Sequence, residues 1–265
     1  MPLDSAVPEP RIEAQPVQRS VMRVRRDGRT DLVAIEEPLE IRVCGEPVVV
    51  TMRTPGRDED LAAGFLYGEG LILEAPEIGL TDDFAVNTIE IRSPLARQPD
   101  SRRFYATSSC GVCGKGALED VAVYANPLPE GPVCPRGLLA SLPDRLVQPG
   151  FACTGGLHAT GLFDHAGRVI DVAEDVGRHN AMDKVIGRAL LDGCLPLHDR
   201  ILCVSGRISF ELVQKAAIAG APIIVGVSAP SSLAIALAAD RNLTLCGFAR
   251  QGRLNVYSAG QRVLG

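Results

Sequence analysis

The 265-residue sequence lacks tryptophan, has few aromatic residues, and is missing the features that define several classes of protein. Its first ten residues contain two acids and three prolines but neither a basic region nor an apolar stretch, so no signal peptide is predicted and we expect a cytoplasmic protein. Eight cysteines in a chain of this length are too few for a disulfide scaffold. We find no internal repeat and no low-complexity segment.

A strong excess of charge of one sign is missing as well. The formal net charge of −5 argues against a general binder of nucleic acids or of anionic membranes. A basic run near the N-terminus is interpreted as a solvated edge, and its members are Arg19, Arg23, Arg25, Arg26 and Arg29. We therefore expect no nucleic-acid partner.

One stretch, residues 216–239, carries no charge over a length that could span a bilayer. Gly220, Pro222 and Pro230 divide it into a helix end, a short strand and the start of a new helix. This punctuation is typical of a buried α/β segment, so we expect no membrane span.

The sequence does contain an alternation of strand and helix patterns. After a Pro-rich tail, the first half predicts a hairpin, a helix, two strands and two short helices, at residues 41–51, 58–67, 86–92, 103–107, 116–124 and 135–146. The second half predicts strands at 167–176, 201–204, 222–227, 243–248 and 253–257, with helices at 178–191, 209–219 and 230–240. The alternation predicts an α/β protein with a mixed sheet flanked by helices and a smaller N-terminal β-rich part.

These patterns also suggest a division of the chain. We predict a flexible tail over residues 1–20, an N-terminal α+β part over 21–107, a mobile CxxC loop over 108–116 and an α/β core over 117–265. The alternative is one integrated domain from 21 to 265.

Two cysteines, Cys110 and Cys113, form a CxxC pair set among glycines and followed by Lys115. Sulfurs this close suit metal ligation, a reversible disulfide, or the carriage of a sulfur atom that a partner thiol helps to release. The glycines leave the backbone free to adopt many conformations, and the lysine favours thiolate.

Alternatives for this pair differ in what else they require. A structural zinc site needs two further ligands; there is no second CxxC, although Cys134, Cys153 and His158 could converge in space. A thioredoxin-like dithiol expects an aromatic residue or proline nearby, and the flanks here are serine and glycine. A zinc nucleobase deaminase expects HxE before its cysteines, whereas His158 follows them with no glutamate in place, so deamination is not predicted.

Polar residues also gather where predicted strands end and helices begin. Ligands of open α/β sheets bind at the carboxyl ends of strands, and helix N-termini attract phosphates. His158, Arg178 and His179 are candidates for such an anion or nucleotide site. The alternative is that Asp175 or Asn180 caps the helix and that Arg178 pairs with an acid.

Two further strand-to-helix turns have the same character. Ser205, Gly206 and Arg207 form the first, and Ser228 marks the second, so that backbone N–H groups and hydroxyls could hold a pyrophosphate with Arg207 as its counter-charge. The last predicted turn offers an aromatic ring and two guanidinium groups, which suit a purine with phosphates, although an ordinary charged hairpin tip is the alternative. Its residues are Phe248, Ala249, Arg250, Gln251, Gly252 and Arg253.

Several long motifs together resemble a known family. They lie at residues 51–56, 64–70, 108–115, 155–159, 175–184, 205–211, 228–230 and 247–250, within a resemblance that runs from about Arg19 to Tyr257 and leaves out 81–102. The family is FdhD, the sulfur carrier proteins for formate dehydrogenase.

The resemblance implies a cytidine-deaminase-like core and a cytoplasmic sulfurtransferase that acts as a homodimer. Such a protein takes sulfane sulfur from a cysteine desulfurase and passes it to the bis(molybdopterin guanine dinucleotide) molybdenum cofactor before that cofactor enters formate dehydrogenase. It also implies that Cys110 carries the persulfide and that residues 248–253 correspond to the family's cofactor-binding stretch, with GDP as a mimic. We expect no permanent metal.

The resemblance leaves an electron balance to be closed. Persulfide sulfur is formally zero-valent and a molybdenum sulfido ligand is sulfide, so two electrons are needed. Our hypothesis is that Cys113 supplies them by closing a disulfide with Cys110 as the sulfide leaves. The alternative function is a non-catalytic cofactor chaperone that uses the CxxC for zinc binding or partner docking.

Overall fold

The computed structural model describes residues 12–18, 20–26, 29–79, 87–97 and 125–265. Cys110 and Cys113 lie outside these residues, as do the strand predicted at 103–107 and the helix predicted at 116–124.

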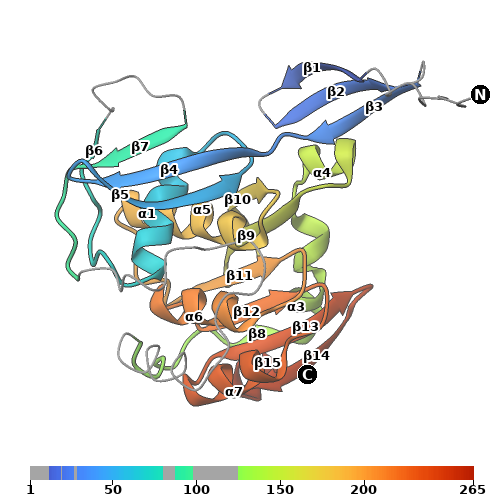
Figure 1. The fold of residues 1–265 in the computed structure, drawn as a ribbon. Coiled ribbons are helices and arrows are strands. Elements are labelled where there is room, and N and C mark those ends of the chain that lie inside the picture. The colour runs from blue at the N-terminus through green and yellow to red at the C-terminus, as the bar shows by residue number, and fades with distance from the viewer. Residues whose placement is uncertain (1–11, 19, 27–28, 80–86, 98–124) are drawn as a thin grey trace, which may run out of the picture.

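A six-stranded mixed sheet is the largest part of the fold (Figure 1). Its spatial order is β10-β9-β11-β12-β13-β14. In chain order the strands are β9 (His158–Asp164), β10 (Val169–Asp175), β11 (Arg200–Val204), β12 (Ile223–Gly226), β13 (Thr244–Arg250) and β14 (Arg253–Ser258). The central strands β11, β12 and β13 run parallel, while β9, β10 and β14 pair with their neighbours in antiparallel fashion. The mixed sheet flanked by helices is therefore confirmed.

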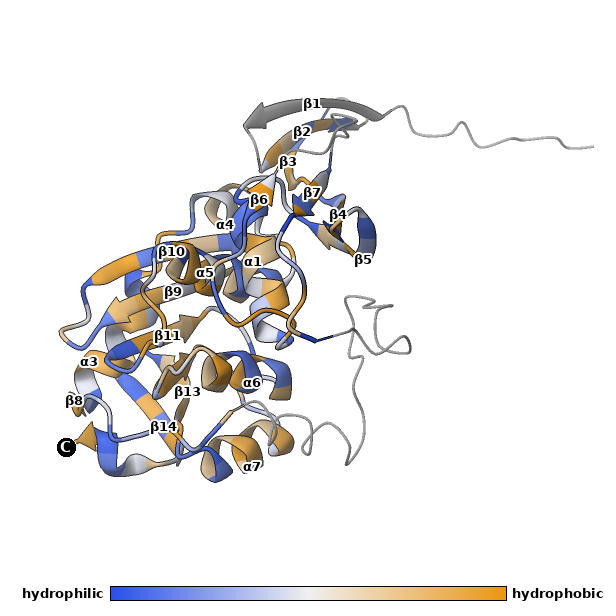
Figure 2. Ribbon diagram, turned by 90° about the vertical axis from the view of Figure 1, so that its left-hand side faces the viewer, coloured by the Kyte–Doolittle hydropathy of each residue, from blue (hydrophilic) through white to orange (hydrophobic). Residues whose placement is uncertain are grey.

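Helices cover both faces of this sheet because alternate residues of its strands point to opposite sides. Leu202, Ile224 and Leu245 are paired in register and face a layer made of α5 (Arg178–Leu191), α6 (Phe210–Ile218) and α7 (Ser232–Asp240). Cys203 and Cys246 face the other layer, which contains α3 (Arg136–Ser141) and the 3-10 helix Leu142–Arg145. Figure 2 shows α6 and α7 on one side of the sheet and α3 on the other.

The N-terminal part of the chain builds a second sheet, in the order β5-β4-β7-β6. Its strands are β4 (Glu37–Val43), β5 (Glu46–Arg53), β6 (Ile78–Gly79) and β7 (Thr88–Ile91). The helix α1 (Asp58–Gly68) packs on one face of this sheet. There Leu61 and Leu66 of the helix form a core with Leu39 and Ile41 of β4, and all four side chains are fully buried. Burial of these apolar side chains holds α1 on the sheet.

Smaller elements complete the structure. A three-stranded antiparallel sheet contains β1 (Ile12–Gln18), β2 (Val21–Arg26) and β3 (Arg29–Ala34), and α4 (Pro149–Thr154) packs against β2 and β3. The short strands β8 (Cys134–Pro135) and β15 (Val263–Leu264) form a parallel pair. No helix among the described residues has both the length and the apolar composition needed to cross a bilayer.

The structure differs from the sequence predictions at several places. Ile12–Gln18 forms β1, so the predicted tail contains a strand. The helix predicted at 135–146 is two short helices, because Pro143 lacks the N–H that would continue the first one. Strands β2, β3 and β9 and helix α4 have no counterpart among the predictions. The cytidine-deaminase-like core and the domain boundaries stay predictions.

Candidate functional site

Several turns of the core sheet meet at one of its edges, which is formed by the carboxyl ends of its parallel strands. The parallel strands β11, β12 and β13 all end there, and the antiparallel strand β9 begins there, with His158 paired in register with Asp175 at the end of β10. The residues predicted from three separate motifs therefore come to the same edge. In strand order they are Arg178 and His179 after β10, His158 on β9, Ser205, Gly206 and Arg207 after β11, Ser228 after β12, and Phe248 and Ala249 near the end of β13.

Backbone contacts join the neighbouring turns. The amide of Ala159 donates to the Ser205 hydroxyl at 2.8 Å, and the amide of Ser205 donates back to the Ala159 carbonyl at 2.9 Å. The amide of Phe248 donates to the Ser228 carbonyl at 3.2 Å. The Ser205 hydroxyl thus helps to hold strand β9 beside the turn.

Gly206 allows the imidazole of His158 to lie against this turn. A Cβ atom at position 206 would stand 3.3 Å from His158 Nδ1, which is tighter than ordinary van der Waals contact. The absence of a side chain at Gly206 therefore brings a histidine ring close to the backbone that leads into Arg207.

The two histidines at this edge have lowered pKa values. Burial lowers the pKa of His158, and the guanidinium groups of Arg178 and Arg207 lower it further, against the opposing effect of Asp175. Burial also lowers the pKa of His179 to about 4, with Arg178 and Lys215 contributing in the same direction. Both imidazoles are therefore neutral at neutral pH, so they can accept hydrogen bonds while the arginines supply the positive charge.

Two residues beyond the predicted set, Ser209 and Glu211, contact His179. Nε2 of His179 lies 3.1 Å from the Ser209 hydroxyl and 3.8 Å from the Glu211 carboxylate. Burial alone would raise the pKa of Glu211, but hydrogen bonds from its own amide and from Ser209, together with His179 and Arg178, lower it overall. Both residues belong to the 205–211 motif. A hydroxyl and a carboxylate at the start of a predicted helix are the sequence feature from which their place in the site could have been predicted.

Arg178 has a buried Nε atom that forms no hydrogen bond with any described residue. A buried donor without a partner is costly, so this atom is a candidate to bind a ligand oxygen. The structure shows no ion pair between Arg178 and an acid within the described part of the chain, unlike the alternative considered from the sequence.

The helix starts at this edge differ in how their amides are satisfied. The N-cap residues of α5 and α6 make no side-chain hydrogen bond, although the Glu211 carboxylate accepts from its own amide in the first turn of α6. The Ser231 hydroxyl accepts from the Ala234 amide at the start of α7. Neither Asp175 nor Asn180 caps α5, whose N-cap is Gly177. First-turn amides without a side-chain cap are donors suited to phosphate oxygens.

The turns at this edge form a row that runs from His158 on β9 to Phe248 on β13, and residues 250–253 form a hairpin turn at the β13 end of this row. Gln251 and Gly252 both have positive φ values, of 50° and 72°, as a two-residue turn between antiparallel strands requires, and Arg250 pairs in register with Arg253. All four residues are exposed, and Phe248 is half-buried with a φ of 54°. Strands β9 and β13 are three positions apart in the sheet, so the row from His158 to Phe248 is about 15 Å long.

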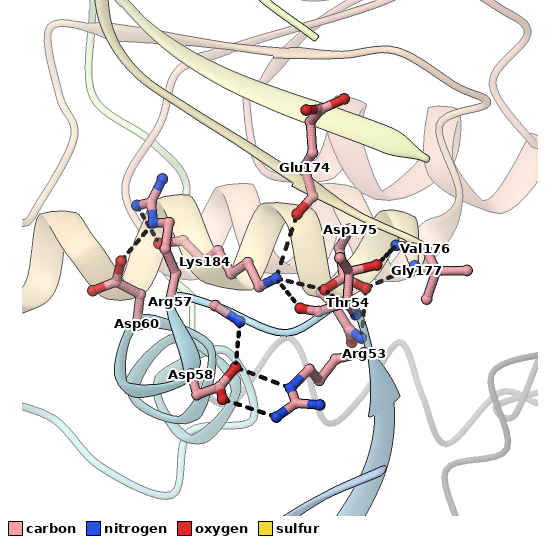
Figure 3. A network of polar contacts seen from close by, with 12 residues as sticks. Arg53, Thr54, Arg57, Asp58, Asp60, Glu174, Asp175, Val176, Gly177 and Lys184 are labelled. Atoms are coloured by element: carbon pink, nitrogen blue, oxygen red, sulfur yellow. Dashed lines mark hydrogen bonds and ion pairs between the residues drawn. The ribbon is translucent and has the colours of Figure 1, made fainter. Parts of the chain in front are cut away.

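Asp175 is the centre of a buried polar network, shown in Figure 3. Its Oδ2 atom accepts from Lys184 Nζ at 2.7 Å and from the Thr54 amide at 3.1 Å. Its Oδ1 atom accepts from the Gly177 amide at 2.8 Å. Lys184 also donates to the Thr54 carbonyl at 2.8 Å. Asp175 and Lys184 are thus fully used inside the protein and have no group free for a ligand.

Within the described ranges no group of three or more His, Cys, Asp or Glu side chains could hold a metal ion. Cys110 and Cys113, which the zinc alternative combines with Cys134, Cys153 or His158, lie outside these ranges. Burial raises the pKa of the Cys134 thiol, which is unfavourable for thiolate.

Comparison with known proteins decides the family. The model of the FdhD/NarQ family matches residues 34–264. This chain belongs to the FdhD/NarQ family. It is 49% identical to the sulfur carrier protein FdhD of Streptomyces avermitilis, over 93% of this chain and 95% of that protein. It is 44% identical to the sulfur carrier protein FdhD of Mycobacterium tuberculosis, over 89% of this chain and 92% of that protein.

A solved structure agrees with this family assignment. The crystal structure of a protein from Desulfotalea psychrophila, described as a formate dehydrogenase accessory protein, superposes with a TM-score of 0.74 at 29% identity. The match covers 97% of this chain and 100% of that one. The fold of this FdhD/NarQ protein is therefore shared with that accessory protein along nearly its whole length.

The described residues that follow the CxxC stretch of this FdhD/NarQ protein are held at the opposite edge of the sheet. Arg241, at the end of α7, donates to the Ala125 carbonyl at 2.7 Å, and Arg262 donates to the Pro129 carbonyl at 2.8 Å. Arg262 also donates to the Asn242 carbonyl, just before β13 begins. Ala125 and Pro129, near the point where the described chain resumes, therefore lie at the amino ends of the parallel strands.

Proposed function

We propose that this FdhD/NarQ protein is a cytoplasmic sulfurtransferase. It accepts sulfane sulfur from a cysteine desulfurase as a persulfide on Cys110 and passes it to the bis(molybdopterin guanine dinucleotide) molybdenum cofactor, its substrate, before the cofactor enters formate dehydrogenase. The support for sulfur carriage is the family itself, because relatives nearly half identical to this chain are named sulfur carrier protein FdhD. The accessory protein of similar fold supports formate dehydrogenase as the client.

The observation that carries the cofactor part of the proposal is the row of turns at one sheet edge. Arg178 and Arg207 provide guanidinium groups, which bind phosphate oxygens through paired hydrogen bonds. The start of α5 provides amides without a side-chain cap. A row about 15 Å long suits an extended dinucleotide better than a single small anion.

Different parts of the row would bind different parts of the substrate. Arg178, Arg207 and the start of α5 suit the pyrophosphates, and the neutral imidazoles of His158 and His179 suit hydrogen-bond donors. The ring of Phe248, beside the exposed guanidinium groups of Arg250 and Arg253, suits a guanine base with its phosphates. As the resemblance implies, we also expect a homodimer.

The sulfur step balances with the two cysteines alone. The thiol of Cys113 attacks the inner sulfur of the Cys110 persulfide, a disulfide forms between the two cysteines, and the outer sulfur leaves as hydrogen sulfide with both protons. The outer sulfur is reduced by two electrons, and the pair of cysteines is oxidised by two. A thiol reductant then restores the pair for the next cycle.

GDP, as the mimic of one half of the substrate, tests the site. Isothermal titration calorimetry at pH 7 should show GDP binding to the wild type and at least about tenfold weaker binding to Arg178→Gln and to Arg207→Gln, because each loses a charge-assisted hydrogen bond. GMP should bind more weakly than GDP because it lacks the second phosphate.

The matched control is Arg168→Gln, at an exposed arginine that pairs with Asp164 in the turn between β9 and β10. This turn is at the other edge of the sheet, so the control should bind GDP as the wild type does. Absence of GDP binding, or equal binding by the wild type and both site variants, would contradict the proposed site.

A further inference from the structure

Thr54 belongs to the N-terminal part of the chain but makes three hydrogen bonds at the edge of the core sheet (Figure 3). Its amide donates to Asp175, its carbonyl accepts from Lys184, and its hydroxyl accepts from the Val176 amide at 3.1 Å. Its side chain is only 2% exposed. Water therefore cannot easily replace these contacts.

The segment that Thr54 holds is the turn from β10 into α5. Met52, two residues earlier, accepts through its carbonyl from the Asn180 side chain at 2.7 Å, and the same amide group of Asn180 donates to Asp175 at 3.0 Å. The turn is thus bound on both sides by residues 52–54, which lie more than 120 positions earlier in the chain.

Arg178 and His179 are the first two residues of α5, immediately after this turn. Because no side chain caps α5, the contacts to residues 175–177 are what fix the helix start. The direction in which the Arg178 guanidinium and the His179 imidazole project depends on that start. A shift of the turn would move both side chains relative to Ser209 and Arg207 on the next unit of the sheet.

We infer that the Thr54 hydroxyl is a positioning group for Arg178 and His179, through which the N-terminal part sets the geometry of the proposed nucleotide site. This inference rests on the proposed function, because it assigns a task to residues of that same site. Thr54 itself does not touch the substrate.

The hydroxyl can be removed with little change in shape. Thr54→Val keeps the branched side chain but leaves the partly buried Val176 amide without this acceptor, so we expect the turn to shift. We expect Thr54→Val to bind GDP about tenfold more weakly than the wild type at a temperature where both are fully folded. Thr54→Ser, which keeps the hydroxyl, should bind within about twofold of the wild type.

A matched control separates positioning from general loss of stability. Thr244 is buried at the opposite edge of the sheet, where its hydroxyl donates to the Ala259 carbonyl at 2.7 Å. Thr244→Val removes the same group from the same residue type and should destabilise the protein without changing its affinity for GDP. If Thr54→Val does not fold, Thr54→Ala and Thr54→Ser serve instead, since they differ only by the hydroxyl oxygen.

A second measurement does not depend on GDP. NMR titration of the imidazole signals should show that Thr54→Val shifts the pKa values of His158 and His179, whereas Thr54→Ser and Thr244→Val leave them as in the wild type. Unchanged histidine titrations and GDP affinity in Thr54→Val would overturn the inference, as would equal losses of affinity in Thr54→Val and Thr244→Val. If the wild type does not bind GDP, the proposed site fails, and the histidine titrations alone then decide whether Thr54 positions α5.

Discussion

His179 shows how burial and charge act on one residue. It is about three-quarters buried, it lies beside Arg178 and within the field of the Lys215 ammonium, and Glu211 compensates only in part. Protonation would place another positive charge in a site that is already cationic and poorly hydrated. The ring is therefore held neutral and is available to Ser209 or to a ligand as a hydrogen-bonding group.

The same environment makes protein stability depend on pH. The folded pKa of His179 is about 4 and its reference value is 6.5, so between these values the unfolded chain binds a proton that the folded protein does not. The free energy of unfolding should therefore fall as pH falls through this window, with His179 contributing a loss of about 2 kcal/mol by pH 5. Urea denaturation measures this effect. Between pH 7 and pH 5, the free energy of unfolding of His179→Gln should fall by about 2 kcal/mol less than that of the wild type.

His198→Gln, at an exposed histidine, is the control for this measurement. Asp183, whose pKa burial raises to about 6, acts in the opposite direction over the same pH range, but it is present in all three proteins. A pH dependence of unfolding that is the same in wild type and His179→Gln would refute the assignment.

At the scale of elements, the contact between α1 and α5 joins the N-terminal part to the core. The two helices meet at Gly64 and Gly187, where a Cβ on Gly187 would overlap the Asp60 carbonyl and a Cβ on Gly64 would overlap the Asp183 carbonyl. Arg57 adds polar contacts across the same junction, donating to Asp171 at 2.7 Å and to the Lys184 carbonyl at 3.2 Å. Close backbone approach is possible only because both positions are glycine.

This packing predicts that Gly187→Ala destabilises the protein strongly. The obstructing atoms belong to the backbone of α1 and cannot rotate away, so the helices must separate, and we expect a loss of about 3 kcal/mol or more in the free energy of unfolding. Chemical denaturation measures it. Gly137→Ala, in α3, meets no atom within 4 Å and should be neutral or slightly stabilising. Equal free energies of unfolding for the two variants would contradict the close packing of α1 against α5 at Gly187.

The elements that the sequence predicts well are those with a clear period. The predicted helix at 178–191 coincides with α5, because Met182, Val185 and Ile186 repeat at helical spacing and are fully buried. Strand β9 was missed because its centre is buried on both faces and has no polar alternation to reveal it. Strand β2 alternates arginine with apolar residues, and the charge of the arginines obscured that pattern.

Across the whole molecule, the gathering of His158, Arg207, Ser228 and Phe248 could be predicted in part, since parallel strands end at a common edge. The sequence could not place Thr54, because its contacts reach Asp175 and Val176 from a separate sheet. The sequence also did not show that Asp175 and Lys184, which belong to a polar motif, form a buried ion pair with each other at 2.7 Å. Spacing along the chain carries no information about such distant partners.

The central claim, that Cys110 carries sulfur, is tested most directly by mass spectrometry of the intact protein after incubation with a cysteine desulfurase and cysteine. The wild type and Cys113→Ser should each gain the mass of one sulfur atom, removable by a thiol reductant, whereas Cys110→Ser should gain none. Cys113→Ser should also release its sulfur more slowly than the wild type, because the resolving thiol is missing. Sulfur uptake on this CxxC by Cys110→Ser, or a wild-type protein that holds one zinc ion per chain and accepts no sulfur, would contradict the account.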